Sequence, residues 1–155
     1  MIVSAYGWQA ALIECDPNDP ASFAAALKSA SPAELVMIHD SQRPLTSLAQ
    51  FERVYAALAA EIDAVRPVSP FTETLKSITA DGFIDQTIDR TSMMRVSTPQ
   101  LIKTSAIDYT ASDSTWFIPL IGSAETATVD ADPDSARINS EKEIELMSYL
   151  LDWNK

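Results

Sequence analysis

The stretch Leu35–Thr46, LVMIHDSQRPLT, decides the predicted fold. Its first four residues, Leu35–Ile38, form a continuous apolar run, which is typical of a buried strand. The run stops at His39 and Asp40, and Arg43 follows three residues later. In open α/β sheets, ligands bind at the carboxyl ends of the strands, where a carboxylate can hold a metal ion and a guanidinium can bind phosphate. We therefore expect this strand near the middle of a parallel sheet and a site at its end; the alternative is a polar turn in which Asp40 caps the next helix.

Composition favours one soluble domain, residues 1–155, with 46% hydrophobic and 21% charged residues. The net charge of -11 argues against nucleic acid or an anionic membrane as partner, although a small phosphorylated ligand is compatible with local basic groups. No apolar run is long enough to cross a membrane and no signal peptide is evident, so we expect a cytoplasmic protein. One cysteine and one histidine exclude an internal disulfide and a Cys/His zinc site.

Hydrophobic spacing predicts the elements around this strand. Apolar residues recur every three or four positions over Ser47–Val65, which indicates an amphipathic helix, and Ala64–Val68 follows as a parallel strand in a βαβ unit. The runs Thr74–Ile78 and Phe83–Ile88 flank an Asp-Gly turn and predict an antiparallel hairpin, an arm of about residues 72–90 that projects from the sheet. Further strands are predicted at 1–6, 10–15, 93–96 and 126–129, and further helices at 22–29, 99–109, 112–121 and 140–153.

Four motifs occur in a characteristic order along the chain. They are HDSQRP at 39–44, SPFTETLK at 69–76, TIDRTSMMRVSTPQ at 87–100 and PDSARINSEKEIELM at 133–147. This ordered set resembles the methylerythritol phosphate cytidylyltransferases of isoprenoid biosynthesis, whose typical forms read HDAARP, VPVTDTLK, TVDRSxLWxVQTPQ and PENIKITTPEDL. The resemblance implies a Rossmann-like three-layer nucleotidyltransferase fold and the transfer of CMP from CTP to methylerythritol phosphate.

The resemblance also implies roles for individual residues. Asp40 matches an aspartate that helps bind Mg²⁺ at the triphosphate, and Arg137 stands in place of a catalytic lysine. Arg43 matches an arginine on the methylerythritol phosphate side. The remaining substrate-binding positions are Ser22, near the cytosine ring, and Thr74, Arg90 and Thr98, around the sugar-phosphate acceptor. Two of these lie on the arm, which in the family reaches into the partner subunit of a homodimer; the alternative for each residue is an exposed polar or capping role.

The chain also departs from the family pattern. Only three glycines are present, Gly7, Gly82 and Gly122, so the glycine-rich loop that wraps the triphosphate is expected to be missing, as though the fold were truncated. The family's Ala-Ala within HDAARP is replaced by Ser41 and Gln42. Two hypotheses follow: a cytidylyltransferase-type enzyme with impaired catalysis, or a pseudoenzyme, a non-catalytic dimeric binding or regulatory protein that recognises a sugar phosphate or a protein partner. A purely structural assembly subunit is a third alternative.

Overall fold

The computed structural model describes residues 13–16, 19–30, 33–111 and 118–153. The chain forms two compact units, one of residues 1–36 and 102–124 and the other of residues 37–101 and 125–155. The division passes through two strands, β1 (Leu35–Ile38) and β6 (Gln100–Lys103). The single domain expected from composition stays a prediction.

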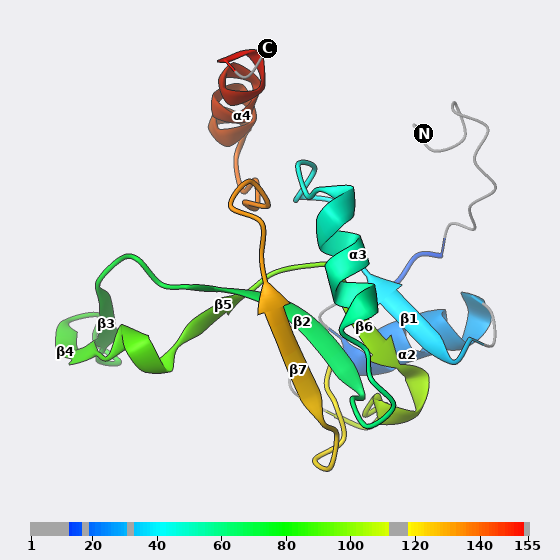
Figure 1. The fold of residues 1–155 in the computed structure, drawn as a ribbon. Coiled ribbons are helices and arrows are strands. Elements are labelled where there is room, and N and C mark those ends of the chain that lie inside the picture. The colour runs from blue at the N-terminus through cyan, green and yellow to red at the C-terminus, as the bar shows by residue number, and fades with distance from the viewer. Residues whose placement is uncertain (1–12, 17–18, 31–32, 112–117, 154–155) are drawn as a thin grey trace. The chain divides into compact units, whose positions relative to one another are not determined.

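The second unit is built on a mixed sheet around β2 (Ala64–Pro70), drawn in green in Figure 1. Along one side, β2 pairs in parallel with β7 (Thr126–Asp130), and it also pairs antiparallel with the short β5 (Met94–Val96). The described strands follow the order β1-β6-β2-β5, with β7 paired to β2 off this path. The strands predicted at 64–68, 93–96 and 126–129 are thereby confirmed.

The expected place of β1 was wrong. Among the described strands it stands at the end of the order, and its residues alternate between exposed and partly buried, with Leu35 and Met37 each more than one third exposed. Among the described strands β1 has a hydrogen-bonded neighbour on one side only, which is the position of an edge strand. A short apolar run does not distinguish such a strand from a central one.

Helix α3 (Leu48–Ala56) packs on this sheet and closes the core of the second unit. Its N-cap is Ser47, whose hydroxyl accepts from the Gln50 N–H. The core is Val54 with Val65 and Leu101, all 2% exposed or less, surrounded by the partly buried side chains of Ala57, Leu58, Ile62, Ala127 and Val129. The helix predicted over 47–65 exists but ends at Ala56; turns follow it, and the last two predicted residues, Ala64 and Val65, belong to β2.

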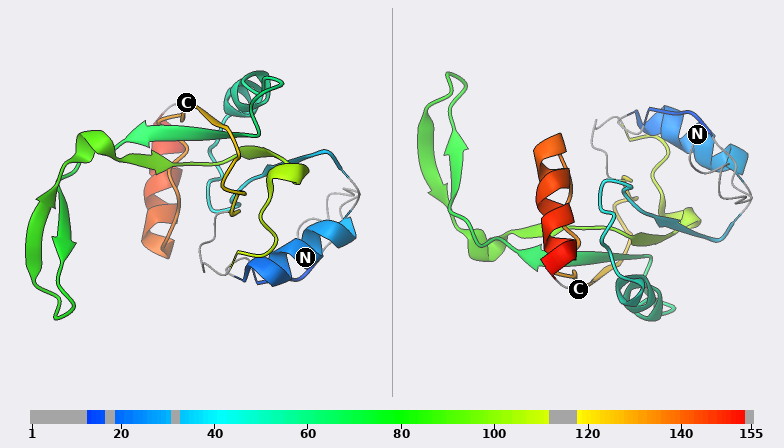
Figure 2. Two further views of the ribbon diagram at one scale, coloured as in Figure 1. Left: turned by 90° about the horizontal axis from the view of Figure 1, so that it is seen from below. Right: turned by 90° about the horizontal axis from the view of Figure 1, so that it is seen from above.

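The predicted arm is confirmed as a separate two-stranded sheet of β3 (Leu75–Ile78) and β4 (Ile84–Ile88), seen as a ribbon in both views of Figure 2. The turn closes with Gly82 N donating to Thr79 O, and Gly82 has a φ of +85°. That left-handed conformation favours glycine, which is the physical basis of the Asp-Gly signal. Ile78, Phe83 and Ile84 are each at least 70% exposed near the tip.

The first unit contains α2 (Pro20–Ala30), which confirms the predicted helix at 22–29. The helix predicted at 99–109 was wrong: residues 100–103 form β6 and Thr104–Ala106 is the short 3₁₀ helix η2. Three consecutive residues of β6 are buried, which requires a strand covered on both faces, and an amphipathic helix cannot bury three in a row. Predictions at 1–6 and 112–117 lie outside the described residues, and residues 13–16 form no strand.

The last helix, α4 (Glu141–Trp153), confirms the prediction at 140–153. Ser140 accepts from the Glu143 N–H, and the Glu143 carboxylate accepts from Asn139 N, one residue before the position of a regular capping box. The one other short helix among the described residues is η1 (Arg90–Ser92), between the arm and β5. None of the helices among the described residues has the length and apolar character that crossing a bilayer requires.

Candidate functional site

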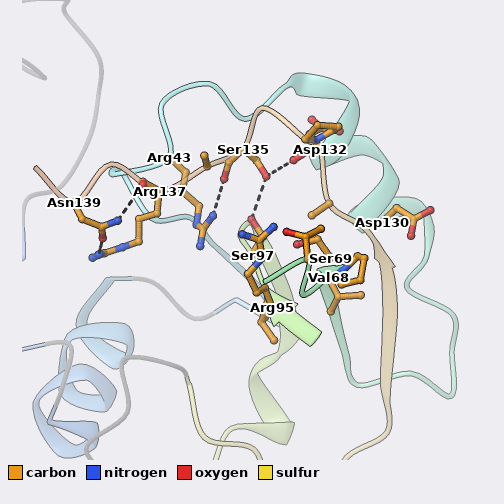
Figure 3. A pocket seen from close by; sticks show the side chains of 16 residues that line it. Arg43, Val68, Ser69, Arg95, Ser97, Asp130, Asp132, Ser135, Arg137 and Asn139 are labelled. Carbon is orange, nitrogen blue, oxygen red and sulfur yellow. Dashed lines mark hydrogen bonds between the residues drawn. The ribbon is translucent and has the colours of Figure 1, made fainter. Parts of the chain in front are cut away.

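A pocket of about 650 Å³ lies in the second unit, at the ends of β2, β5 and β7 and beside the loop that follows β1. Figure 3 shows its side chains at close range. Its polar lining consists of three arginines, five neutral hydrogen-bonding side chains and two carboxylates: Arg43, Arg95, Arg137, Ser69, Thr72, Ser97, Ser135, Asn139, Asp130 and Asp132. This convergence of guanidinium groups with hydroxyl and amide groups is suited to an oxyanion such as phosphate.

Asp40 is held on both carboxylate oxygens. Oδ1 accepts from the Gln42 N–H at 2.9 Å, and Oδ2 accepts from Arg137 Nε at 2.8 Å in an ion pair. Partial burial opposes ionisation of Asp40, but these two hydrogen bonds outweigh it and hold the pKa of the carboxyl below its ordinary value. Asp40 is therefore an ionised carboxylate at neutral pH.

Arg137 donates hydrogen bonds to three neighbouring side chains. Besides its bond to Asp40, Nη1 donates to Asn139 Oδ1 and Nη2 donates to Gln42 Oε1, so each guanidinium nitrogen has a protein acceptor. The main chain adds a bond from Ile138 N to Gln42 O at 2.8 Å. Arg137 therefore fastens the loop after β1 to the segment before α4.

Arg43 faces the pocket from a tight turn that its N–H closes on Asp40 O at 2.9 Å. Its Nη1 donates to Ser135 O at 2.6 Å, as the dashed line in Figure 3 marks, while its buried Nε has no protein acceptor. Burial lowers the pKa of Arg43; nearby Asp40 opposes this, and the charges of Arg137 and Arg95 add to it. The guanidinium remains charged at neutral pH and has a donor to spare.

Thr98 is 1% exposed and is hydrogen-bonded to the main chain of Asp40. Its hydroxyl oxygen accepts from Asp40 N at 3.1 Å and lies 3.1 Å from His39 Nδ1. Partial burial lowers the pKa of His39, so its imidazole is neutral at pH 7 and can accept the threonine proton at Nδ1. Thr98 does not line the pocket, so it acts on the site through the Asp40 main chain.

A second network, which the sequence did not suggest, joins two walls of the site. Gln50 is fully buried; its Nε2 donates to Thr98 O at 2.7 Å and its Oε1 accepts from Asp132 N. The Asp132 carboxylate in turn pairs with Arg53 and accepts from the hydroxyl of Ser47. These contacts fix the loop after β7, which bears Ser135 and Arg137, against α3.

Four predicted site residues, Asp40, Arg43, Thr98 and Arg137, thus lie together in the second unit. Three others do not join them. Ser22 belongs to the first unit, where its hydroxyl accepts from Asp16 N at 3.1 Å. Thr74 is exposed next to β3 and does not line the pocket. Arg90 donates from η1 to Thr72 O, and Thr72 is a lining residue, so Arg90 borders the pocket through one main-chain contact.

A resident magnesium ion does not fit the described residues. They contain no group of three or more histidine, cysteine or acidic side chains able to hold a metal ion. Asp40 is the one carboxylate at the expected position, and both of its oxygens already accept hydrogen bonds. Magnesium needs about six oxygen ligands, so most would have to come from water and a ligand's phosphates.

Comparison with known proteins agrees with the motif order. The family model described as 2-C-methyl-D-erythritol 4-phosphate cytidylyltransferase matches residues 4–118 of this chain. The chain belongs to this cytidylyltransferase family. It is 33% identical to the 2-C-methyl-D-erythritol 4-phosphate cytidylyltransferase of Nocardia farcinica, over 84% of this chain and 59% of that protein. It is 35% identical to the bifunctional enzyme IspD/IspF of Rhodospirillum rubrum, over 76% of this chain and 32% of that protein. The chain thus spans about 59% of the length of its Nocardia relative.

Solved structures of the family share the fold of this cytidylyltransferase-family chain. The 4-diphosphocytidyl-2C-methyl-D-erythritol synthase of Anaerococcus prevotii superposes with a TM-score of 0.70 at 22% identity, covering 97% of this chain and 71% of that one. The cytidylyltransferase of Thermus thermophilus gives 0.65 at 24% identity, covering 86% and 69%. The predicted Rossmann-like nucleotidyltransferase fold is confirmed by these likenesses.

Proposed function

We propose that this chain binds the sugar-phosphate acceptor of cytidylyl transfer, methylerythritol phosphate, in the arginine-lined pocket of its second unit. The supporting observation is the convergence of Arg43, Arg95 and Arg137 on one cavity with the hydroxyls of Ser97 and Ser135. A phosphate group accepts several charge-assisted hydrogen bonds, and guanidinium groups supply them in the matching fork geometry. The hydroxyl and amide side chains suit the alcohol groups of a sugar phosphate.

Catalysis by the 155-residue chain alone is proposed to be impaired. Its three glycines, Gly7, Gly82 and Gly122, are far apart in sequence, so these residues include no glycine-rich loop to surround a triphosphate. The triphosphate of CTP has about four negative charges, and the chain has a net charge of -11. Asp40 is the side chain we propose as a single ligand to a divalent cation that arrives on the nucleotide. Losing one preorganised donor slows such reactions about 100-fold or more, so the expected turnover is very low.

The arm is proposed to form a homodimer. Ile78, Phe83 and Ile84 present apolar side chains that are at least 70% exposed, and a two-stranded ribbon is marginally stable by itself. A twofold pairing would cover these side chains on both subunits. Light scattering at micromolar concentration should give the mass of a dimer, and Phe83→Ser should shift it toward the monomer; a monomeric native chain would refute this part of the proposal.

Binding is tested by calorimetric titration of methylerythritol phosphate into the chain and into Arg43→Gln. Removing a charged hydrogen-bond donor costs about 1.5–3 kcal/mol, so Arg43→Gln should bind roughly 10- to 150-fold more weakly. Lys142→Gln is the matched control, since it removes the same charge from the exposed surface of α4 and should bind like the native chain. No heat of binding to the native chain, or equal binding by Arg43→Gln, would contradict the proposal.

Turnover is tested separately with a coupled pyrophosphate assay on CTP, Mg²⁺ and methylerythritol phosphate. The proposal expects no pyrophosphate release above background from the chain alone. Turnover that disappears in Asp40→Asn would show that the chain is a competent enzyme, and the acceptor-binding part of the proposal would still stand.

A further inference from the structure

The three arginines of the pocket differ in what they already bind. Each guanidinium nitrogen of Arg137 donates to a protein acceptor, including the ion-paired carboxylate of Asp40. Arg43 uses one nitrogen on Ser135 O and leaves its buried Nε without an acceptor. Arg95, which extends from β5, makes no hydrogen bond or ion pair among the described residues. Free donors for a ligand are therefore found mainly on Arg43 and Arg95.

The charges around the pocket also favour Arg43 and Arg95 as the residues that bind a ligand. Arg137 is neutralised by Asp40, and the lining carboxylate of Asp132 is neutralised by Arg53. Arg43, Arg95 and Arg137 thus share one nearby carboxylate, Asp40, and this group of side chains keeps two net positive charges. Arg95 lies close enough that its charge lowers the pKa of Arg43. Two like charges held together in a partly buried pocket favour a dianion between them.

Asp130 is the remaining lining carboxylate, and among the described residues it forms no ion pair with Arg43 or Arg95. Figure 3 shows Asp130 at the end of β7, with its side chain directed away from Arg43 and Arg137. Its one described contact to a cation is through the main chain, where Asp130 O accepts from Arg53. The positive side of the pocket is thus the side lined by Arg43 and Arg95, with the hydroxyl of Ser97 next to them.

From this arrangement we infer that Arg95 is a ligand-binding residue that, with Arg43, makes the pocket selective for a phosphomonoester dianion over a monoanion. The inference rests on the proposed function and adds to it a residue and a charge preference. Arg137 is a positioning residue in this scheme, because its donors hold Asp40, Gln42 and Asn139 in place. Neutral sugars and monoanionic esters would leave at least one of the two net positive charges of this group without a counter-charge.

The test uses two probes of equal size at pH 8, methyl phosphate, a dianion there, and methyl sulfate, a monoanion. Calorimetric titration should show the native chain binding methyl phosphate at least tenfold more tightly than methyl sulfate. Arg95→Gln should bind methyl phosphate at least tenfold more weakly and lose most of this preference, whereas Lys142→Gln should match the native chain. Arg95→Lys keeps the charge but not the planar guanidinium group, so its affinity for methyl phosphate should lie between the affinities of the native chain and Arg95→Gln.

The outcomes distinguish a failure of this inference from a failure of the proposed function. If the native chain binds methyl phosphate and Arg43→Gln weakens it, but Arg95→Gln stays within twofold of native, the role of Arg95 is refuted and the acceptor pocket stands. If the native chain binds neither methyl phosphate nor methylerythritol phosphate, both are refuted. Arg95 is exposed and without a described hydrogen bond, so its substitution should leave the thermal unfolding midpoint unchanged, which circular dichroism verifies.

Discussion

Gln50 offers the sharpest test of how the site is held together. Its side chain is completely buried, yet it is polar, and its two ends bind main-chain groups far apart in sequence, Thr98 O and Asp132 N. Buried main-chain groups are almost always hydrogen-bonded, because leaving one unpaired costs its full desolvation energy. Gln50→Leu keeps nearly the same volume and removes both bonds at once.

The magnitude follows from the two groups that lose their partner. Leaving the buried Thr98 O unpaired costs about 1–3 kcal/mol, the partly buried Asp132 N costs less, and the extra apolar burial of leucine offsets roughly 1 kcal/mol, so the net loss is about 1–4 kcal/mol. Domains of this size are typically stable by about 5–15 kcal/mol, so the effect is large. Because Thr98 supports Asp40 and the Asp132 loop leads to Arg137, binding of methylerythritol phosphate should weaken as well.

Urea denaturation measures this loss as a lower midpoint with an unchanged slope. The matched control is Leu48→Ala, on the same helix, where the side chain is 74% exposed and the change should stay within about 0.5 kcal/mol. Gln50→Glu separates the two ends: its carboxylate can still accept from Asp132 N but cannot donate to Thr98 O until it is protonated. A Gln50→Leu chain within 0.5 kcal/mol of native would refute the bridging role.

Three further outcomes are expected. Leu101→Ala removes a side chain that is 2% exposed in the core and should destabilise the chain by about 2–5 kcal/mol in urea; a loss below 1 kcal/mol would contradict that packing. The lowered pKa of Asp40 means that its ionised form stabilises the fold above its ordinary pKa and that this stabilisation is lost as pH falls through the lowered value. The gap in melting temperature between native and Asp40→Asn should therefore narrow below about pH 4, and a constant gap would argue against the ion pair. Gly82→Ala meets no atom within 4 Å but forces a left-handed φ on alanine, so it should cost about 1–2 kcal/mol and raise amide exchange in β3 and β4 only; unchanged exchange there would be contrary to the expectation.

The elements that the sequence predicted well are those whose cause is local. The Asp-Gly turn at Gly82 needs a conformation that the adjacent residues themselves specify, and the hairpin follows from it. The cap of α3 at Ser47 and that of α4 at Ser140 likewise involve residues within one turn of each other. Such elements do not depend on distant partners, so their pattern in the sequence was sufficient.

The failures concern elements whose state is set by distant contacts. Pro99 followed by mixed apolar residues is compatible with a helix start, and nothing local shows that Gln100, Leu101 and Ile102 are enclosed within a sheet. The end of α3 at Ala56 is similar, because the segment after it meets Glu125 O through the N–H of Asp63 and is drawn into the sheet. Burial on both faces overrode a weak local preference in these places.

The candidate site likewise combines residues that the local sequence pattern predicted with residues whose role depends on distant contacts. Asp40 and Arg43 were recognisable because a hydrophobic strand ends beside them and a short turn joins them. Gln50 gave no signal, since a single amide in an amphipathic helix normally faces solvent, and its partners are 48 and 82 residues away. Arg95 occupies a variable position of a family motif, so its proposed role could not be predicted from the motif. That role depends on the ion pair between Asp40 and Arg137, which only the structure shows.

Two departures from the family pattern explain each other through the geometry of Arg137. An ammonium at this position would offer a compact charge to Asp40, whereas a guanidinium extends two further nitrogens that need acceptors. Gln42 supplies one acceptor at a position where the family has alanine, and Asn139 supplies the other. Arginine at 137 is therefore matched to glutamine at 42, and both residues donate a hydrogen bond to the Asp40 carboxylate. Because each nitrogen of Arg137 already donates to a protein acceptor, the proposed phosphate binding relies mainly on the other cations of the pocket, Arg43 and Arg95.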